Sequence, residues 1–136
     1  MLKAKDIMTK EVITVTRDTP VFEAIELLWK NEITGIPVVE YDMTLVGILT
    51  EKDVLRLFYT HEVHKNETVK SFMSQPAVHV DENEPLSEAC ACLMNYFFRR
   101  VPVTSKGKVV GIISRPDLIE HILRQRQGNT IPAAGT

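Results

Sequence analysis

The chain has 136 residues, of which 44% are apolar and 25% are charged, and it carries a formal net charge of −2 at pH 7. These values are typical of a globular protein with one domain or two very small ones, and the slightly acidic balance gives no general attraction to nucleic acid. No apolar run approaches the ~20 residues that cross a bilayer, and none has the form of a signal peptide, so we expect no membrane partner. Cys90 and Cys92 lie two residues apart, on different faces of an expected helix. A disulfide between them is not expected, which favours a reduced, cytoplasmic protein.

The two halves of the sequence are similar to each other. At an offset of 65 residues, Ile7-Met8-Thr9 aligns with Phe72-Met73-Ser74, and Ile36-Pro37-Val38 with Val101-Pro102-Val103. The second half lacks one residue in a turn, after which Val46-Gly47-Ile48 aligns with Val110-Gly111-Ile112 and Asp53 with Asp117. So many matches indicate two copies of one structural unit. We place the first repeat at 1–62, the second at 63–127 and a flexible tail at 128–136.

Each repeat has the element order β-α-β-β-α, which predicts an α+β fold. In the first repeat we expect a strand at 13–16, a helix at 21–32, strands at 36–40 and 45–49, and a helix at 51–59. The corresponding elements of the second repeat are 78–81, 86–97, 101–104, 109–113 and 115–126. Pro20 and Pro85 stand in the first turn of the middle helices, where the missing N–H is not needed. The two closely spaced strands predict a hairpin.

A strand-to-helix corner recurs after each hairpin. The apolar strands end at Thr50 and Ser114, and a carboxylate follows three residues later, at Asp53 and Asp117. A hydroxyl residue at this place is an N-cap, and the carboxylate completes a capping box that needs no ligand. The same groups, beside free backbone N–H groups, also suit an anionic ligand with hydroxyl groups. Both interpretations stay open at this point.

The middle helices carry more apolar side chains than one buried face requires. Trp29 belongs to this excess in the first repeat, and Tyr96 and Phe97 belong to it in the second. A helix that is apolar nearly all round is buried on two sides. One side covers its own sheet, and the other packs either on the second repeat or on a second chain. We expect the second chain, and therefore a homodimer.

These repeated motifs resemble a tandem pair of cystathionine β-synthase (CBS) domains, also called a Bateman module. The resemblance rests on Asp6-Ile7-Met8, on residues 34–39 and 46–54, and on their counterparts Ser71-Phe72-Met73, 100–103 and 110–118. It covers nearly the whole chain. It implies two β-α-β-β-α units packed through their sheets with pseudo-twofold symmetry, and disc-shaped dimers. It also implies clefts between the repeats that bind adenine nucleotides or related adenosyl compounds, for sensing and not for catalysis.

The resemblance further implies roles for individual residues. Asp53 and Asp117 would accept hydrogen bonds from ribose hydroxyls, with Thr50 and Ser114 near ribose or phosphate. The adenine would lie against apolar residues of the opposite repeat: Ala77, Val78, Phe98 and Val101 for the Asp53 cleft, and Val12, Ile13, Ile33 and Ile36, next to Pro37, for the Asp117 cleft. Arg99 and Arg100 occupy the approach to the Asp53 cleft, whereas Thr34 and Gly35 occupy the approach to the Asp117 cleft, which Arg115 would serve. We therefore expect the Asp53 cleft to be the better phosphate site.

The sequence shows no paired nucleophile and base, no nucleotide-phosphate loop and no clustered metal ligands, so we expect neither an enzyme nor a metal site. The expected function is a regulatory module that binds AMP, ADP or ATP, uses no catalytic cofactor, and signals in trans to an effector protein. Two alternatives remain. One is a dimerisation scaffold whose clefts bind no ligand, and the other is an enzyme subunit whose site is shared at the dimer interface.

Overall fold

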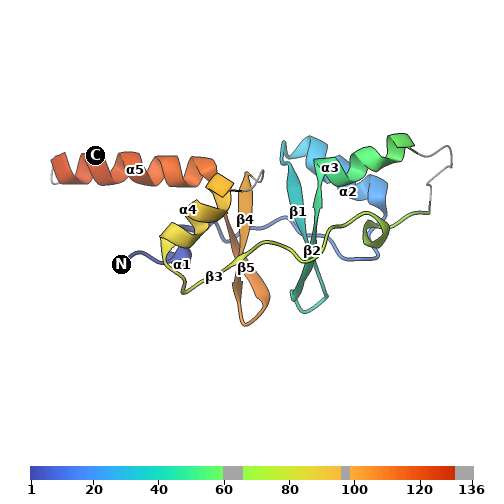
Figure 1. Ribbon diagram of the computed structural model, residues 1–136, viewed down its shortest axis with the longest axis horizontal. Coiled ribbons are helices and arrows are strands. Elements are labelled where there is room, and N and C mark those ends of the chain that lie inside the picture. The colour runs from blue at the N-terminus through green and yellow to red at the C-terminus, as the bar shows by residue number, and fades with distance from the viewer. Residues whose placement is uncertain (60–65, 96–98, 131–136) are drawn as a thin grey trace.

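The computed structural model describes residues 1–59, 66–95 and 99–130. The first part of the chain forms helices α1 (Ala4–Ile7) and α2 (Val21–Lys30), strands β1 (Gly35–Val39) and β2 (Leu45–Thr50), helix α3 (Glu51–Val54) and the 3₁₀-helix η1 (Leu55–Tyr59). The second part forms the 3₁₀-helix η2 (Val69–Ser71), β3 (Val80–Asp81), α4 (Leu86–Asn95), β4 (Arg100–Ser105), β5 (Lys108–Ser114) and α5 (Arg115–Thr130). The repeated order of helices and strands confirms the α+β fold (Figure 1).

An antiparallel hairpin forms the centre of each repeat. β1 pairs with β2 in one sheet, and β4 pairs with β5 in the other, where β3 adds a parallel third strand. Both hairpins shift register at equivalent places, after Val38 and after Val103. The strand expected at 13–16 is reduced to a single bridge between Val15 and Val38. The Thr16 N–H donates to the Thr19 hydroxyl instead (3.0 Å), which turns the chain away from the sheet.

The helix expected at 51–59 forms in two short pieces. α3 ends at Val54 and the chain tightens into η1, as helix ends often do. The Arg56 Nε donates to the Asp53 carbonyl oxygen (3.2 Å), an acceptor that the next turn of an α-helix would use. The counterpart in the second repeat, α5, continues as one helix of 16 residues and projects from the body of the molecule (Figure 1).

The two repeats exchange their leading segments. Ala4 is fully buried in the core of the second repeat, and its N–H donates to the Glu84 carbonyl (2.9 Å). Val69 is fully buried in the core of the first repeat, and its N–H donates to the Thr19 carbonyl (2.9 Å). Figure 1 accordingly shows α1 beside α4, away from β1 and β2. Neither core is complete without a segment that the sequence places at the start of the other repeat.

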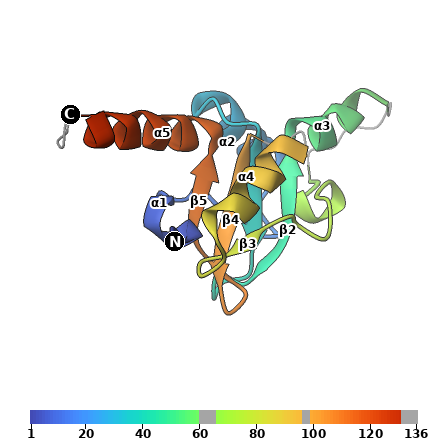
Figure 2. The same ribbon diagram turned by 60° about the vertical axis from the view of Figure 1, so that its left-hand side comes forward.

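The hairpin turns of the two repeats are bonded to each other. The Leu45 N–H donates to the Gly107 carbonyl (3.0 Å), and the Val109 N–H donates to the Met43 carbonyl (2.9 Å). Figure 2 shows both turns at the same end of the molecule. The strand ends that lead into α3 and α5 lie at the other end of the hairpins, so the two corners are on the side away from these bonds.

Among the described residues, the middle helices α2 and α4 each bury one face. α2 buries Val21, Ala24 and Leu28, whereas Trp29 is 83% exposed. α4 buries Ala89 and Leu93 and exposes Met94, while Tyr96 and Phe97 lie outside the described residues. Where the structure describes the chain, none of its helices is both long enough and apolar enough to cross a membrane.

Candidate functional site

The corner at the end of β2 is a complete capping box. The Thr50 hydroxyl oxygen accepts a hydrogen bond from the Asp53 N–H (3.2 Å), and Asp53 Oδ2 accepts from both the Thr50 N–H and the Thr50 hydroxyl (2.9 Å each). The other carboxylate oxygen, Oδ1, accepts from the hydroxyl of Ser74 (2.7 Å). The cap therefore fixes the orientation of a half-buried carboxylate that also has an oxygen directed away from its own helix.

The corner at the end of β5 repeats this arrangement with fewer bonds. Asp117 Oδ2 accepts from the Ser114 N–H (2.9 Å), and the Asp117 N–H donates to the Ser114 hydroxyl oxygen (3.3 Å). Ser114 is only 8% exposed. Within the described residues, no other hydrogen bond reaches the Asp117 carboxylate. Both capping interpretations are thus confirmed, and the ligand interpretation depends on the cavities beside the carboxylates.

The Asp53 cavity has a volume of about 860 Å³. Thr50 and Asp53 line it, whereas three of the expected base-contacting residues, Ala77, Val78 and Val101, do not. Ala77 and Val101 are buried, Val78 packs against the core of the second repeat, and Phe98 lies outside the described residues. The lining is instead completed from β2, α3, η1, α4 and the segment before β3, by Ile48, Lys52, Leu55, Arg56, Tyr59, Phe72, Met73, Ser74, Pro76 and Asn95.

The Asp117 cavity is smaller, about 270 Å³, and it gathers more of the expected residues. Ile13, Ile33, Gly35, Ser114 and Asp117 line it together, and Thr9, Glu11, Arg100 and Ile112 complete the lining. Five expected residues are elsewhere, of which Thr34 and Pro37 line a separate central cavity. Val12 is half-buried outside the lining, Ile36 is fully buried in the first core, and the Arg115 guanidinium donates to the Leu93 carbonyl at the end of α4 (3.0 Å).

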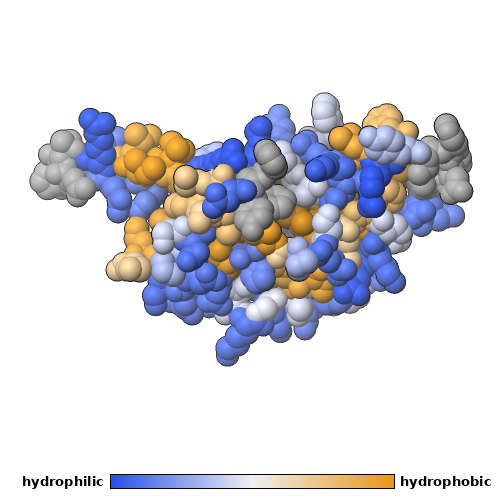
Figure 3. Space-filling view, in the orientation of Figure 1, coloured by the Kyte–Doolittle hydropathy of each residue, from blue (hydrophilic) through white to orange (hydrophobic). Residues whose placement is uncertain are grey.

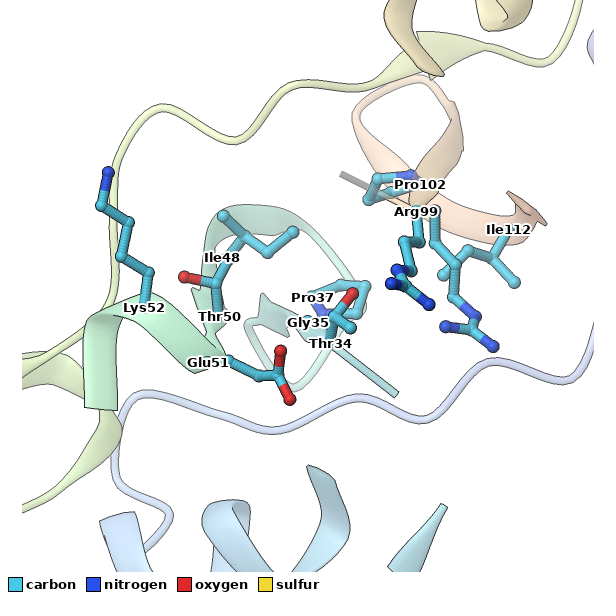
Figure 4. Close-up of a pocket in the computed structure, with 11 residues that line it drawn as sticks. Thr34, Gly35, Pro37, Ile48, Thr50, Glu51, Lys52, Arg99, Pro102 and Ile112 are labelled. Carbon is cyan, nitrogen blue, oxygen red and sulfur yellow. The ribbon is translucent and has the colours of Figure 1, made fainter. Parts of the chain in front are cut away.

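A third cavity, of about 310 Å³, lies between the repeats (Figure 4). The pairs Pro37 and Pro102, and Ile48 and Ile112, are repeat counterparts, so this cavity is on the pseudo-twofold axis. The remaining lining residues are Thr34, Gly35, Thr50, Glu51, Lys52, Arg99 and Arg100. Figure 4 shows Arg99 across the cavity from Thr50 and Glu51.

Arg99 and Arg100 were expected at the approach to the Asp53 cleft. Neither lines the Asp53 cavity; both line the central cavity, and Arg100 also lines the Asp117 cavity. Their guanidinium groups have no hydrogen bond or ion pair with any described residue. Unpaired guanidinium groups facing a cavity suit a phosphate or carboxylate. Because Arg100 belongs to the second repeat's own β4, sequence order alone could not assign it to the Asp117 cleft.

Ser74, Thr9 and Glu11 are site residues that the sequence interpretation did not include. One signal was available, since Thr9 and Ser74 are counterparts in the aligned repeats and both are hydroxyl residues. Each lies beside a corner because its backbone pairs with a central strand, Ser74 with Ile48 and Thr9 with Ile112. That pairing is a contact between distant segments, which the hydroxyl pattern alone does not reveal.

Two observations concern reactive groups among the described residues. Burial raises the pKa of the Cys92 thiol, and the charges of Glu84 and Glu88 raise it further, so this half-buried group stays a protonated, weak nucleophile. Residues 1–59, 66–95 and 99–130 contain no group of three or more His, Cys, Asp or Glu side chains that could hold a metal ion.

Comparison with known proteins agrees with these two repeats. The CBS domain family matches residues 4–60 and 69–124, so this chain belongs to the CBS domain family as a tandem pair. The chain is 33% identical over 119 residues to the CBS domain-containing protein YhcV of Bacillus subtilis, covering 87% of this chain and 84% of YhcV. It is 30% identical to MJ1225 and to an inosine-5'-monophosphate dehydrogenase, both of Methanocaldococcus jannaschii, but spans only 41% and 27% of their lengths.

Solved structures show the same fold. CBSX2 in complex with AMP superposes with a TM-score of 0.79 at 28% identity, covering 93% of this chain and 99% of that one. The CBS domain pair of MJ0100, in complex with 5'-methylthioadenosine and S-adenosylmethionine, gives a TM-score of 0.74 at 26% identity, covering 91% and 98%. The tandem CBS arrangement expected from the sequence is confirmed.

Proposed function

We propose that this chain is a regulatory module that binds an adenosine nucleotide, AMP, ADP or ATP, between its repeats and reports it in trans to an effector protein. One observation carries the proposal. The Asp117 cavity brings together apolar side chains (Ile13, Ile33), a carboxylate oriented by its cap (Asp117) and an unpaired guanidinium (Arg100). These are the three groups that a base, a ribose diol and a phosphate require.

The relatives support an adenosyl ligand, but their ligands differ in charge, so the charge of the ligand is inferred from the residues of this chain. CBSX2 is found with AMP, whereas MJ0100 is found with the uncharged 5'-methylthioadenosine and the sulfonium compound S-adenosylmethionine. Arg99 and Arg100 line the central cavity, and no described residue pairs with either guanidinium. Two positive charges favour a phosphate and oppose a sulfonium, so we propose a phosphorylated ligand. We also propose that the chain is not an enzyme, since it matches only about a quarter, 27%, of the dehydrogenase.

The bonded hairpin turns suggest how binding would be reported. The turns join the repeats at one end, and the corners lie at the other end. A ligand between the corners favours the separation of the repeats that it fits, and thereby shifts the population toward one geometry. An effector that distinguishes the two geometries is then coupled to the nucleotide.

A second copy of the chain would cover apolar side chains at the outer helices. Leu55, Phe58 and Tyr59 on η1 have Ile119, Ile122 and Leu123 on α5 as their repeat counterparts, and all six are 54–85% exposed. Figure 3 shows apolar groups at both of these ends. Exposed apolar groups at symmetric positions suit a symmetric dimer.

Light scattering tests this homodimer. At micromolar concentration the measured mass should be twice the 15.4 kDa chain mass, and the double variant Phe58→Glu with Ile122→Glu should have half of that dimer mass. A monomeric wild-type mass would contradict the homodimer.

The complete capping boxes favour a second candidate, a scaffold with no ligand, since both carboxylates have partners without one. Thermal melting with AMP, ADP, ATP and S-adenosylmethionine separates the two. A ligand that binds only the folded state, at ~100 times its dissociation constant, stabilises by ~2.7 kcal/mol, or several degrees. We expect this shift with a nucleotide. If no compound shifts the melting temperature at millimolar concentration, the scaffold is the function that remains.

A further inference from the structure

The acceptor capacity of Asp53 is mostly used within the protein. An ionised carboxylate has about four acceptor positions, two on each oxygen. Oδ2 accepts from the Thr50 N–H and hydroxyl (2.9 Å each), and Oδ1 accepts from the Ser74 hydroxyl (2.7 Å). About one position is left. A ribose diol donates two hydroxyl hydrogens, so Asp53 cannot accept both while the Ser74 bond persists.

The backbone of Ser74 is held in place by hydrogen bonds on both sides. Its backbone N–H donates to the Ile48 carbonyl (2.8 Å), and its carbonyl accepts from the Ile48 N–H (3.0 Å). Gln75 Nε2 donates to the Val46 carbonyl (2.9 Å). On the other side, the Arg56 guanidinium donates to the carbonyls of Ser71 (3.2 Å) and Phe72 (2.6 Å). Rotation of the Ser74 side chain can break its bond to Asp53, but these hydrogen bonds hold the backbone of residues 71–75 beside the Asp53 corner.

The acceptor capacity of Asp117, in contrast, is mostly free. Its Oδ2 accepts one bond, from the Ser114 N–H (2.9 Å). The counterpart of Ser74 is Thr9, whose backbone exchanges two hydrogen bonds with Ile112 (2.9 Å each) and which lines the same cavity. Between described residues, the Thr9 hydroxyl makes no bond to the carboxylate. Three acceptor positions remain, enough for both ribose hydroxyls, with Arg100 in the same cavity.

From these bonds we infer that the Asp117 cleft binds the nucleotide first, and that Ser74 is a positioning residue that keeps the Asp53 cleft at low affinity through Asp53. The inference rests on the proposed function, since it ranks the two clefts of that function. Binding of a nucleotide at Asp53 requires the Ser74 hydroxyl to rotate away from Oδ1. One Ser74 bond therefore sets the nucleotide concentration at which the second cleft fills.

The test uses calorimetric titration of AMP into the full chain. Wild type should show one tight site, and Asp117→Asn should weaken that site at least ~10-fold, so that only weak binding remains. Ser74→Ala in the Asp117→Asn background should then strengthen AMP binding about tenfold, the value of one charge-assisted hydrogen bond. Ser74→Thr, which keeps the hydroxyl, should stay weak. With 2'-deoxy-AMP, which has one hydroxyl to donate, the gain should vanish, a result that a general loosening of the cleft would not give.

The outcomes separate this inference from the proposed function. If wild type binds AMP but Ser74→Ala gives no gain, or if the tight site survives Asp117→Asn, the ranking of the clefts is overturned while the proposed function stands. If wild type binds no nucleotide at millimolar concentration, both are overturned. Ser74→Cys keeps the size of the side chain but donates weakly. It should reproduce the gain if the alanine variant folds poorly, and failure of both variants to strengthen binding would overturn the role of Ser74.

Discussion

Thr50 and Ser114 hold equivalent places in the two repeats, and each begins a helix with a carboxylate three residues on. The surroundings of the two carboxylates nevertheless differ. Asp53 accepts three hydrogen bonds, one of them from a distant segment, whereas Asp117 accepts one from the residues that the structure describes. One of the two additional bonds to Asp53 comes from the Thr50 hydroxyl within the cap, and the other comes from Ser74 in the segment that pairs beside the hairpin. The repeated motif thus fixes the capping box, while a residue outside the motif decides whether the outward-facing carboxylate oxygen is free for a ligand.

The glycines of the two central strands show the same contrast. A Cβ atom on Gly47 would lie 2.8 Å from the backbone oxygen of Ser74. A Cβ atom on the counterpart, Gly111, would meet the side chain of Met8. In the first repeat, hydrogen-bonded backbone lies against the glycine of the central strand. In the second repeat, a flexible thioether side chain lies there instead.

The largest expected effect is on stability, from Gly47→Ala. The new methyl group must displace the Ser74 backbone, whose carbonyl accepts from Ile48 (3.0 Å), and overpacking of this kind costs roughly 1–3 kcal/mol. Gly111→Ala should cost less because the Met8 side chain can adopt another rotamer. Urea unfolding measures both free energies. A greater loss for Gly111→Ala would contradict the proposed difference between the repeats.

The next effect is on affinity, from Asp117→Asn. The change removes the charge and replaces one acceptor oxygen with a donor, so the tight nucleotide site should weaken at least ~10-fold. Asp53→Asn should weaken nucleotide binding by a smaller factor, because its carboxylate is largely engaged by Thr50 and Ser74. Titration calorimetry with AMP compares them, and the reverse order would restore the Asp53 cleft as the principal site.

Without ligand, the order of the same two variants should invert. Asp53→Asn disturbs three accepted hydrogen bonds and should cost up to about 1 kcal/mol of unfolding free energy, whereas Asp117→Asn disturbs one and should cost a few tenths. Thermal unfolding of the two variants in nucleotide-free buffer is the measurement. Equal losses would show that the extra bonds to Asp53 contribute nothing to the apo fold.

The smallest effect concerns the hairpin turns. Hydrogen bonds from the Thr44 side chain, and then from its backbone, hold the pKa of the Asp42 carboxyl below its ordinary value of 3.8. A carboxyl whose folded pKa is lowered stabilises the fold above its unfolded pKa, and that contribution is lost as the pH falls from 3.8 through the folded value.

NMR titration measures this shift. The pKa of Asp42 should lie below 3.8 in the wild type, and Thr44→Val should return that pKa toward 3.8. The other turn, Ser105-Lys106-Gly107, has no carboxylate and should not respond. An unshifted Asp42 in wild type would contradict the role of Thr44.

Local pattern was enough for the repeated elements. The apolar periodicity, the prolines at Pro20 and Pro85, and the hydroxyl-to-carboxylate spacing predicted the hairpins, the middle helices and both capping boxes, and the structure contains them. These features depend on residues a few positions apart, so their energetics are largely contained in the sequence around them. The tandem CBS pair followed from the same motifs because two copies in register are a specific signal.

Contacts between distant segments were decided only in three dimensions. The exchange of Ala4 and Val69 between the cores, the position of Arg100 in the Asp117 cavity and the bond from Ser74 to Asp53 all join residues that no local pattern connects. The strand expected at 13–16 failed for a related reason, since the Thr19 hydroxyl took an N–H that the sheet would have used. For each such contact, several donors or apolar surfaces could occupy the same acceptor or cavity. Which of them does so depends on the packing of the whole chain.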